Sequence, residues 1–140
     1  MTIGNRRAVR LEWTGEGMRF RGIGVEPPSP AVEIDGDTET GPSPMLALLL
    51  AAGGCSGADV VSMLKKMKVE LARAEIEVSG ERRAEEPRRY VSLHYRYVLS
   101  GAGLDRNKAE RAVELSLQKY CSVVHTLAPD IKLTYEIVVE

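Results

Sequence analysis

Two thiols are the side chains with the most distinctive chemistry in this sequence. Cys55 and Cys121 are the only cysteines among its 140 residues. The N-terminus shows no secretion signal, so a reducing compartment is expected, where such a pair is either two buried thiols or a redox-active pair. Whether the cysteines are buried thiols or a redox-active pair therefore depends on the residues around each of them.

The residues around Cys55 are unusually small. The stretch "LLLAAGGCSGADVV" places Gly53, Gly54 and Gly57 beside the thiol within an apolar run. Each glycine in a helix interior costs roughly 0.8–1 kcal/mol relative to alanine. That cost is tolerable where another backbone approaches closely, either a second helix or the same helix of a partner chain.

A nucleophilic Cys55 also needs help to ionise. A free thiol has a pKa of about 8.5, and only its thiolate is strongly nucleophilic. Cys55 lies about eleven residues into its predicted helix, too far from the N-terminus for the helix dipole to act alone. A nearby cation is therefore required.

The elements that must position these thiols follow from apolar periodicity. Three short strands are predicted over 7–13, 18–25 and 31–35, with Val9, Leu11 and Trp13 on one face of the first. A helix of about two dozen residues follows Ser43 and Pro44, which suit its N-cap and first turn.

The second half begins with two alternating strands near 71–78 and 91–99, joined by the charged hairpin loop "GERRAEEPRR". Asp105 then caps a helix over 106–120, with Tyr120 on its apolar stripe; a short helical turn and a strand over 131–139 follow. The order βββαββααβ indicates an α+β fold, with a long cysteine-bearing helix on an antiparallel sheet.

Composition narrows the classes of partner. Nineteen basic and twenty acidic residues give a formal charge of −1, which argues against nucleic acid or an anionic membrane. The longest apolar run, 45–52, is too short to span a bilayer, so a cytoplasmic protein is expected. We predict a single domain over 1–140 and no bound cofactor, because no Gly-rich nucleotide loop is present.

A long apolar helix is hard for one small sheet to cover in a chain of this size. Together with the glycines around Cys55, this favours a homodimer whose two chains share a core.

Two longer motifs resemble a known superfamily. "GPSPMLALLLAAGGCSGADVVSMLKKMK" and "DRNKAERAVELSLQKYCSVV" are similar to the OsmC/Ohr superfamily, named for an osmotically inducible protein and for organic hydroperoxide resistance, and specifically to its less characterised OsmC-like branch. The resemblance covers nearly the whole chain. It implies an intertwined α+β homodimer with an active site at each side of the subunit interface.

The resemblance also implies roles for both thiols. Cys55 corresponds to the peroxidatic cysteine and Cys121 to the resolving one, which together would reduce an organic hydroperoxide in an antioxidant, oxidative stress response. A disulfide requires Cα atoms within about 7 Å. An external dithiol, such as a dihydrolipoyl protein or thioredoxin, would return the disulfide to two thiols.

The peroxidases of this superfamily complete the site with an arginine from the N-terminal strands and a glutamate. Here Arg19 and Arg21 are the candidate arginines, since they alternate onto one strand face. The glutamate is missing, because Met45 and Leu46 occupy its position. This departure keeps an alternative open, a non-enzymatic binding protein that holds a small apolar ligand at the dimer interface.

A metal site is the weaker reading of the thiols. His125 lies four residues after Cys121, and His94 is the only other histidine. This spacing fits no compact zinc motif, so no metal is predicted.

Overall fold

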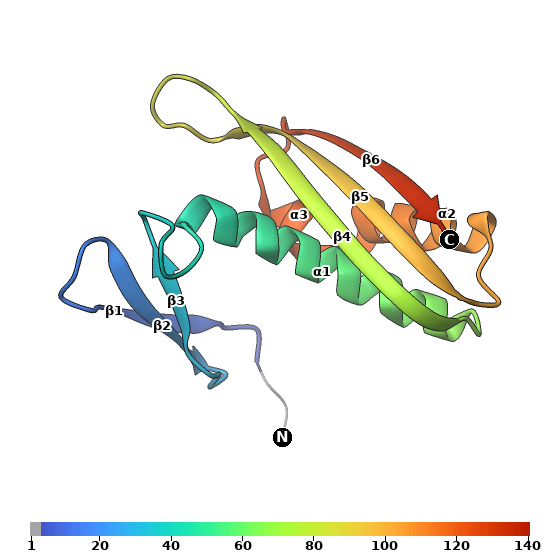
Figure 1. Ribbon diagram of the computed structural model, residues 1–140, viewed down its shortest axis with the longest axis horizontal. Coiled ribbons are helices and arrows are strands. Elements are labelled where there is room, and N and C mark those ends of the chain that lie inside the picture. The colour runs from blue at the N-terminus through green and yellow to red at the C-terminus, as the bar shows by residue number, and fades with distance from the viewer. Residues whose placement is uncertain (1–3) are drawn as a thin grey trace. The chain divides into compact units, whose positions relative to one another are not determined.

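The computed structural model describes residues 4–140, and the first three residues of the predicted domain lie outside that range. Its elements follow the predicted order βββαββααβ, with one additional helical segment after the second helix (Figure 1). Contacts group the chain into two compact units, one ending at Leu48 and the other spanning Leu49–Glu140. That the whole chain forms a single domain stays a prediction.

The N-terminal unit contains an antiparallel three-stranded sheet. Strands β1 (Ala8–Trp13), β2 (Arg19–Glu26) and β3 (Val32–Asp35) lie in that order, as the three predicted strands require. Trp13 is paired with Phe20, and Phe20 with Ile34. The predicted apolar face of β1 is not buried within the chain, because Val9, Leu11 and Trp13 are 70%, 50% and 59% exposed.

Helix α1 (Pro44–Lys66) is the long helix predicted from the sequence. The Leu46 N–H donates to the Ser43 side chain at 3.3 Å, so Ser43 acts as the expected N-terminal cap. Lys65 and Lys66 in the last turn suit the negative end of the helix dipole.

The C-terminal unit contains a second sheet, with β4 (Glu70–Arg82), β5 (Tyr90–Ala102) and β6 (Lys132–Val139) side by side (Figure 1). Strands β4 and β5 are antiparallel, but β6 pairs with β5 in parallel. The prediction of an antiparallel sheet is therefore wrong for β6. The helices between β5 and β6 carry the chain back to the same end of the sheet, which makes this pair parallel.

The core of this unit lies on one face of the sheet. Tyr95, Tyr97 and Leu99 alternate along β5 and are fully buried, which confirms the predicted period of two. They belong to one apolar cluster with α1 residues such as Leu64 and α2 residues such as Val113, so both helices cover this face.

The second predicted helix is interrupted before it reaches Cys121. Helix α2 (Arg106–Leu115) has the expected Asp105 cap, which accepts from the Lys108 N–H at 2.8 Å, and a π-helical segment η1 (Ser116–Tyr120) follows. The wider turn shifts the buried stripe by one residue, because the Cys121 N–H donates to the Ser116 carbonyl five positions back. Tyr120 is consequently 50% exposed, contrary to prediction, and Cys121 is buried.

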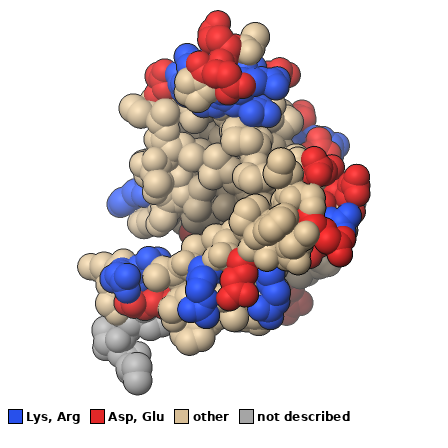
Figure 2. Space-filling model, turned by 90° about the vertical axis from the view of Figure 1, so that its left-hand side faces the viewer, with Lys and Arg blue, Asp and Glu red and all other residues tan. Residues whose placement is uncertain are grey.

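Charged side chains gather on the loop that joins β4 and β5, at the top of the molecule in Figure 2. Arg82 and Arg83 donate to main-chain carbonyls of Arg88 and Pro87 across this loop. The loop is the solvated hairpin end that its sequence predicts.

Helix α1 is long and apolar enough to cross a membrane by length and composition alone, with a mean hydropathy of 1.6 over its best window. The run 45–52 therefore understates the apolar length of this helix. Within the C-terminal unit, however, Ala52, Val60 and Leu64 are fully buried in the core described above. Only 28% of that window is buried in the single chain, so the core accounts for part of the apolar composition of this helix.

Candidate active site

The structure brings the two cysteines of the C-terminal unit together. Cys55 lies half-buried on α1, and Cys121 is fully buried between η1 and the short helix α3 (Ser122–Thr126). The two side chains are close enough for Cys55 to affect the ionisation of Cys121, and both are free thiols. A partly accessible thiol is thus in contact with an inaccessible one.

The environment of Cys121 favours its protonated form. Burial has the largest effect, and together with the neighbouring Cys55 side chain it raises the pKa of Cys121 to about 11, although the Val124 backbone N–H acts in the opposite direction. Cys121 therefore keeps its proton at neutral pH.

Two of the three glycines around Cys55 lie against side chains of strand β4. A Cβ at Gly53 would lie 3.0 Å from the Val78 side chain, and one at Gly57 would lie 2.8 Å from that of Ile76. The neighbour at these positions is β4, and the expectation of a helix there is wrong. Gly54 differs, since within residues 4–140 no atom beyond its chain neighbours and the backbone of its own helix lies within 4 Å of its Cβ position.

A chain of buried hydroxyl groups runs beside the thiols. The Ser56 hydroxyl is hydrogen-bonded to the Tyr97 hydroxyl at 2.6 Å and to the Ser116 hydroxyl at 2.9 Å. The Ser116 hydroxyl donates to the Asp59 carboxylate at 2.9 Å. Sequence analysis missed this network, although two serines at buried positions of apolar helices are a usable signal.

Two buried tyrosines of β5 lie near the thiols. The rings of Tyr95 and Tyr97 are stacked with centroids 5.8 Å apart, and the Tyr95 hydroxyl donates to the Ala52 carbonyl at 3.2 Å. Burial is the main reason that the pKa of each lies well above its usual range. Both phenols are therefore neutral hydrogen-bonding groups.

A pocket of about 400 Å³ opens beside Asp59. It is lined by Asp59, Ser62, Met63, Lys66, Leu115 and Tyr120. Asp59 therefore has two neighbours: it accepts a hydrogen bond from the buried hydroxyl network, and it lines this surface pocket.

His125 is engaged by the main chain. Its Nδ1 lies 2.9 Å from the Cys121 carbonyl oxygen, and its Nε2 lies 3.0 Å from that of Gln118. Within residues 4–140, no three His, Cys, Asp or Glu side chains are grouped as metal ligands would be. The ring serves to tie α3 to the π-helical segment.

The two candidate arginines of the N-terminal unit have different surroundings. Arg19 forms ion pairs with Glu16 at 3.1 Å, Glu39 at 3.2 Å and Asp35 at 3.7 Å. Arg21 is exposed and takes part in none of the ion pairs found among residues 4–140. Arg19 is therefore held by acidic side chains of its own unit, whereas the Arg21 side chain is exposed.

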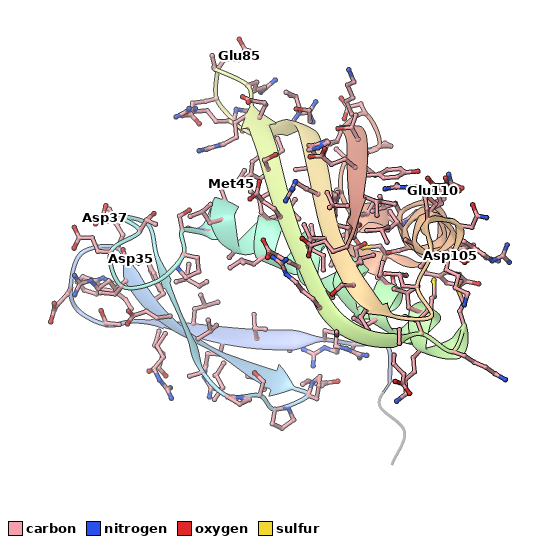
Figure 3. All side chains as sticks on the ribbon, turned by 45° about the vertical axis from the view of Figure 1, so that its right-hand side comes forward. Asp35, Asp37, Met45, Glu85, Asp105 and Glu110 are labelled. Carbon is pink, nitrogen blue, oxygen red and sulfur yellow. The ribbon has the colours of Figure 1, made fainter. Side chains whose placement is uncertain are left out.

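Asp35 organises the loop that holds Arg19 (Figure 3). Its buried carboxylate accepts main-chain N–H groups, above all those of Asp37 and Thr40 and also that of Glu39. These hydrogen bonds lower the pKa of Asp35 to about 2 although burial opposes them. Asp35 was not among the predicted site residues, and the structure gives it a local structural role.

The position of the missing glutamate lies in the first turn of α1, where Met45 is found (Figure 3). No acidic residue occupies this turn. The structure thus brings Cys55 and Cys121 together, whereas Arg19 and Arg21 belong to the other unit.

The sequence matches a family model described as "OsmC-like protein" over residues 35–136. This chain belongs to the OsmC-like family. Protein YhfA of Escherichia coli is 37% identical to it over 133 residues, which cover 93% of this chain and 97% of that protein.

Solved structures agree with the assignment to the OsmC-like family. A hypothetical protein from Aquifex aeolicus is 31% identical, with a TM-score of 0.81 and coverage of 98% of this chain and 99% of that one. The organic hydroperoxide resistance protein OhrB of Bacillus subtilis shares the fold at 16% identity, with a TM-score of 0.59 and coverage of 96% and 98%. The resemblance to this family and the α+β fold predicted from the sequence are both confirmed.

Proposed function

We propose that this OsmC-like protein is a thiol-dependent peroxidase for small organic hydroperoxides. The Cys55 thiolate attacks the outer oxygen of ROOH, the O–O bond breaks, and the alkoxide takes up a proton and leaves as an alcohol. Cys121 then attacks the resulting Cys55 sulfenic acid, giving a disulfide and water. An external dithiol returns both sulfurs to thiols.

The contact between two unequal thiols carries this proposal. Cys55 is partly accessible, as an attacking sulfur must be, and Cys121 is fully buried against it. The Bacillus subtilis protein with this fold is named for resistance to organic hydroperoxides, which supports the same substrate class.

For the cation that stabilises the Cys55 thiolate we propose Arg21. Arg19 is held by the loop around Asp35, so using it at a reacting centre would mean giving up three ion pairs. Arg21 has no such commitment among the described residues, and its long side chain is exposed.

We further propose that the active protein is a cytoplasmic homodimer. In the single chain, an apolar face of the N-terminal sheet remains exposed at Val9, Leu11, Trp13 and Val32. Helix α1 likewise exposes Leu50 and Val61. Exposed apolar patches of this kind are typical of protein interfaces, and a second copy would bury them.

One observation favours a second candidate function. Met45 and Leu46 lie where the peroxidases carry a carboxylate, so the first turn of α1 is apolar. A protein that only holds an apolar ligand would tolerate this replacement.

The test is a count of free thiols before and after one equivalent of cumene hydroperoxide. A peroxidase loses both thiols in the wild type, and the Cys121→Ser variant accumulates sulfenic acid on Cys55. The Cys55→Ser variant is the matched control and should consume peroxide only at the background rate. Two thiols that survive in the wild type would contradict the peroxidase and favour the binding protein.

A further inference from the structure

Asp59 connects the long helix to the segment that carries Cys121. It lies one helical turn after Cys55 on α1 and accepts a hydrogen bond from the Ser116 hydroxyl at 2.9 Å. Ser116 is fully buried and is also bonded to Ser56. The carboxylate is therefore held in a fixed place at the edge of the core.

Ser116 uses its main chain for a second task. Its carbonyl accepts the Cys121 N–H at 2.7 Å, the bond that closes the π-helical turn. Ser116 thus binds the Asp59 carboxylate with its side chain and the backbone N–H of Cys121 with its carbonyl. π-helical turns of this kind occur frequently at functional sites.

The charge of Asp59 acts on Cys121. Its negative charge adds to burial and to the contact with Cys55 in raising the pKa of that thiol. The other ionisable groups around Cys121 are Tyr95 and Tyr97 of β5, whose phenols stay neutral, and His125 of α3, which faces the Cys121 carbonyl. Asp59 is thus a fixed carboxylate that is linked to Cys121 through Ser116, whose hydroxyl binds Asp59 and whose carbonyl accepts the Cys121 N–H.

We propose that Asp59, anchored by Ser116, is a positioning residue that keeps the proton on Cys121, so that Cys55 attacks and Cys121 resolves. This role rests on the proposed peroxidase function. The proton placement itself does not depend on turnover.

The proton has a use in the resolving step. As the Cys121 sulfur attacks the Cys55 sulfenic acid, the S–S bond forms and the S–O bond breaks. The hydroxyl group leaves with the Cys121 proton as water, so atoms and charge balance without a proton entering from solvent. A thiol that ionised early would lack this proton and would compete with Cys55 as the attacking sulfur.

The experiment measures the ionisation of Cys121 in the Cys55→Ser variant, which contains a single thiol. Protein labelled with ¹³C at cysteine Cβ is titrated by NMR between about pH 8 and 12, a range that spans the raised pKa. Adding Asp59→Asn should lower the midpoint by about half a pH unit, roughly a threefold fall in the proton affinity of the thiol.

Two further variants separate the charge from the fold. Asp130→Asn removes the same charge from the surface, where Asp130 pairs with Arg89, and should leave the midpoint unchanged. Ser116→Ala keeps the Asp59 charge but releases its anchor, so a smaller fall of at most about twofold in proton affinity is expected. Circular dichroism at each pH confirms that the variants are folded.

The outcomes distinguish this inference from the proposed function. A midpoint that does not move in Asp59→Asn, or that moves equally in Asp130→Asn, overturns the role of Asp59 even if the wild type consumes peroxide. A shift confined to Asp59→Asn and Ser116→Ala supports it. If the wild type then loses no thiols to cumene hydroperoxide, the peroxidase has failed while the proton placement stands.

Discussion

The two units of the chain differ in how they use their apolar residues. In the C-terminal unit, alternate residues of β5 are fully buried under α1 and α2, and buried hydroxyl groups are paired with one another. The N-terminal sheet has the same alternation in β1, yet Leu11 and Trp13 remain exposed. A period of two therefore identifies an apolar face without saying what covers it.

The difference also separates the two kinds of candidate site residue. The thiols lie in the C-terminal unit, where burial above all raises the pKa of Cys121. The arginines lie in the unit with an uncovered face. A site that uses a thiol and an arginine would therefore need a residue from the unit whose apolar face is exposed in the single chain.

The sharpest way to test this contrast is to make one substitution in each unit. Leu99→Ala removes a fully buried side chain and should lower the free energy of unfolding by about 2–5 kcal/mol. Leu11→Ala, at a position 50% exposed, should change it by roughly 0.5 kcal/mol or less when the chain is monomeric. Urea unfolding at low protein concentration gives both values, and equal losses would contradict the contrast.

The uncovered face can be challenged with a charge. Leu11→Glu should weaken the proposed homodimer by more than about tenfold, since a carboxylate would be buried without a partner. Ala8→Glu introduces the same charge on the opposite face of β1 and is the matched control. Sedimentation velocity over a concentration series measures the dissociation constants, and a monomeric wild type would remove the proposal.

The buried hydroxyl network can be tested by deleting single oxygen atoms. Tyr97→Phe breaks the 2.6 Å bond to Ser56 and should cost about 1 kcal/mol of unfolding free energy. Tyr95→Phe loses only the 3.2 Å bond to the Ala52 carbonyl and should cost less. Thermal denaturation compares the pair, and the reverse order would show that the network adds little to stability.

A further test concerns the acid response of the N-terminal unit. The pKa of Asp35 is lowered from 3.8 to about 2, so its stabilising contribution is complete above about pH 4 and is lost as the pH falls toward 2. The amide signals of Asp37, Glu39 and Thr40 should shift with that low midpoint in an NMR titration.

Asp35→Asn should abolish these amide shifts and weaken the loop at neutral pH. The matched control is Asp37→Asn, whose exposed side chain lies on the same loop. A midpoint near the ordinary value of an aspartate would show that the hydrogen bonds to Asp35 do not hold in solution.

Local signals in the sequence predicted much of this fold. Ser43 and Asp105 cap the helices they precede, and the alternation in β5 identifies its buried face, because caps and periodicity depend on neighbouring residues. The pairing of Cys55 with Cys121 came from the resemblance to a known superfamily.

Other features depend on contacts between distant residues. The parallel pairing of β6 follows from the path of the intervening helices. The bond between Ser56 and Ser116 joins positions sixty residues apart. The register error at Tyr120 arose because a regular helical period was assumed through a π-helical turn.

That turn holds one residue more than an ordinary α-helix would place between Ser116 and Cys121. Deleting a single residue there would restore an ordinary α-helix, which advances by about 100° per residue. The cysteine would then reach by four-residue spacing from Ser116 the buried position that it now reaches by five-residue spacing. An alignment that keeps both cysteines but loses one residue here would therefore pair sequences whose second thiols lie on the same face of the helix.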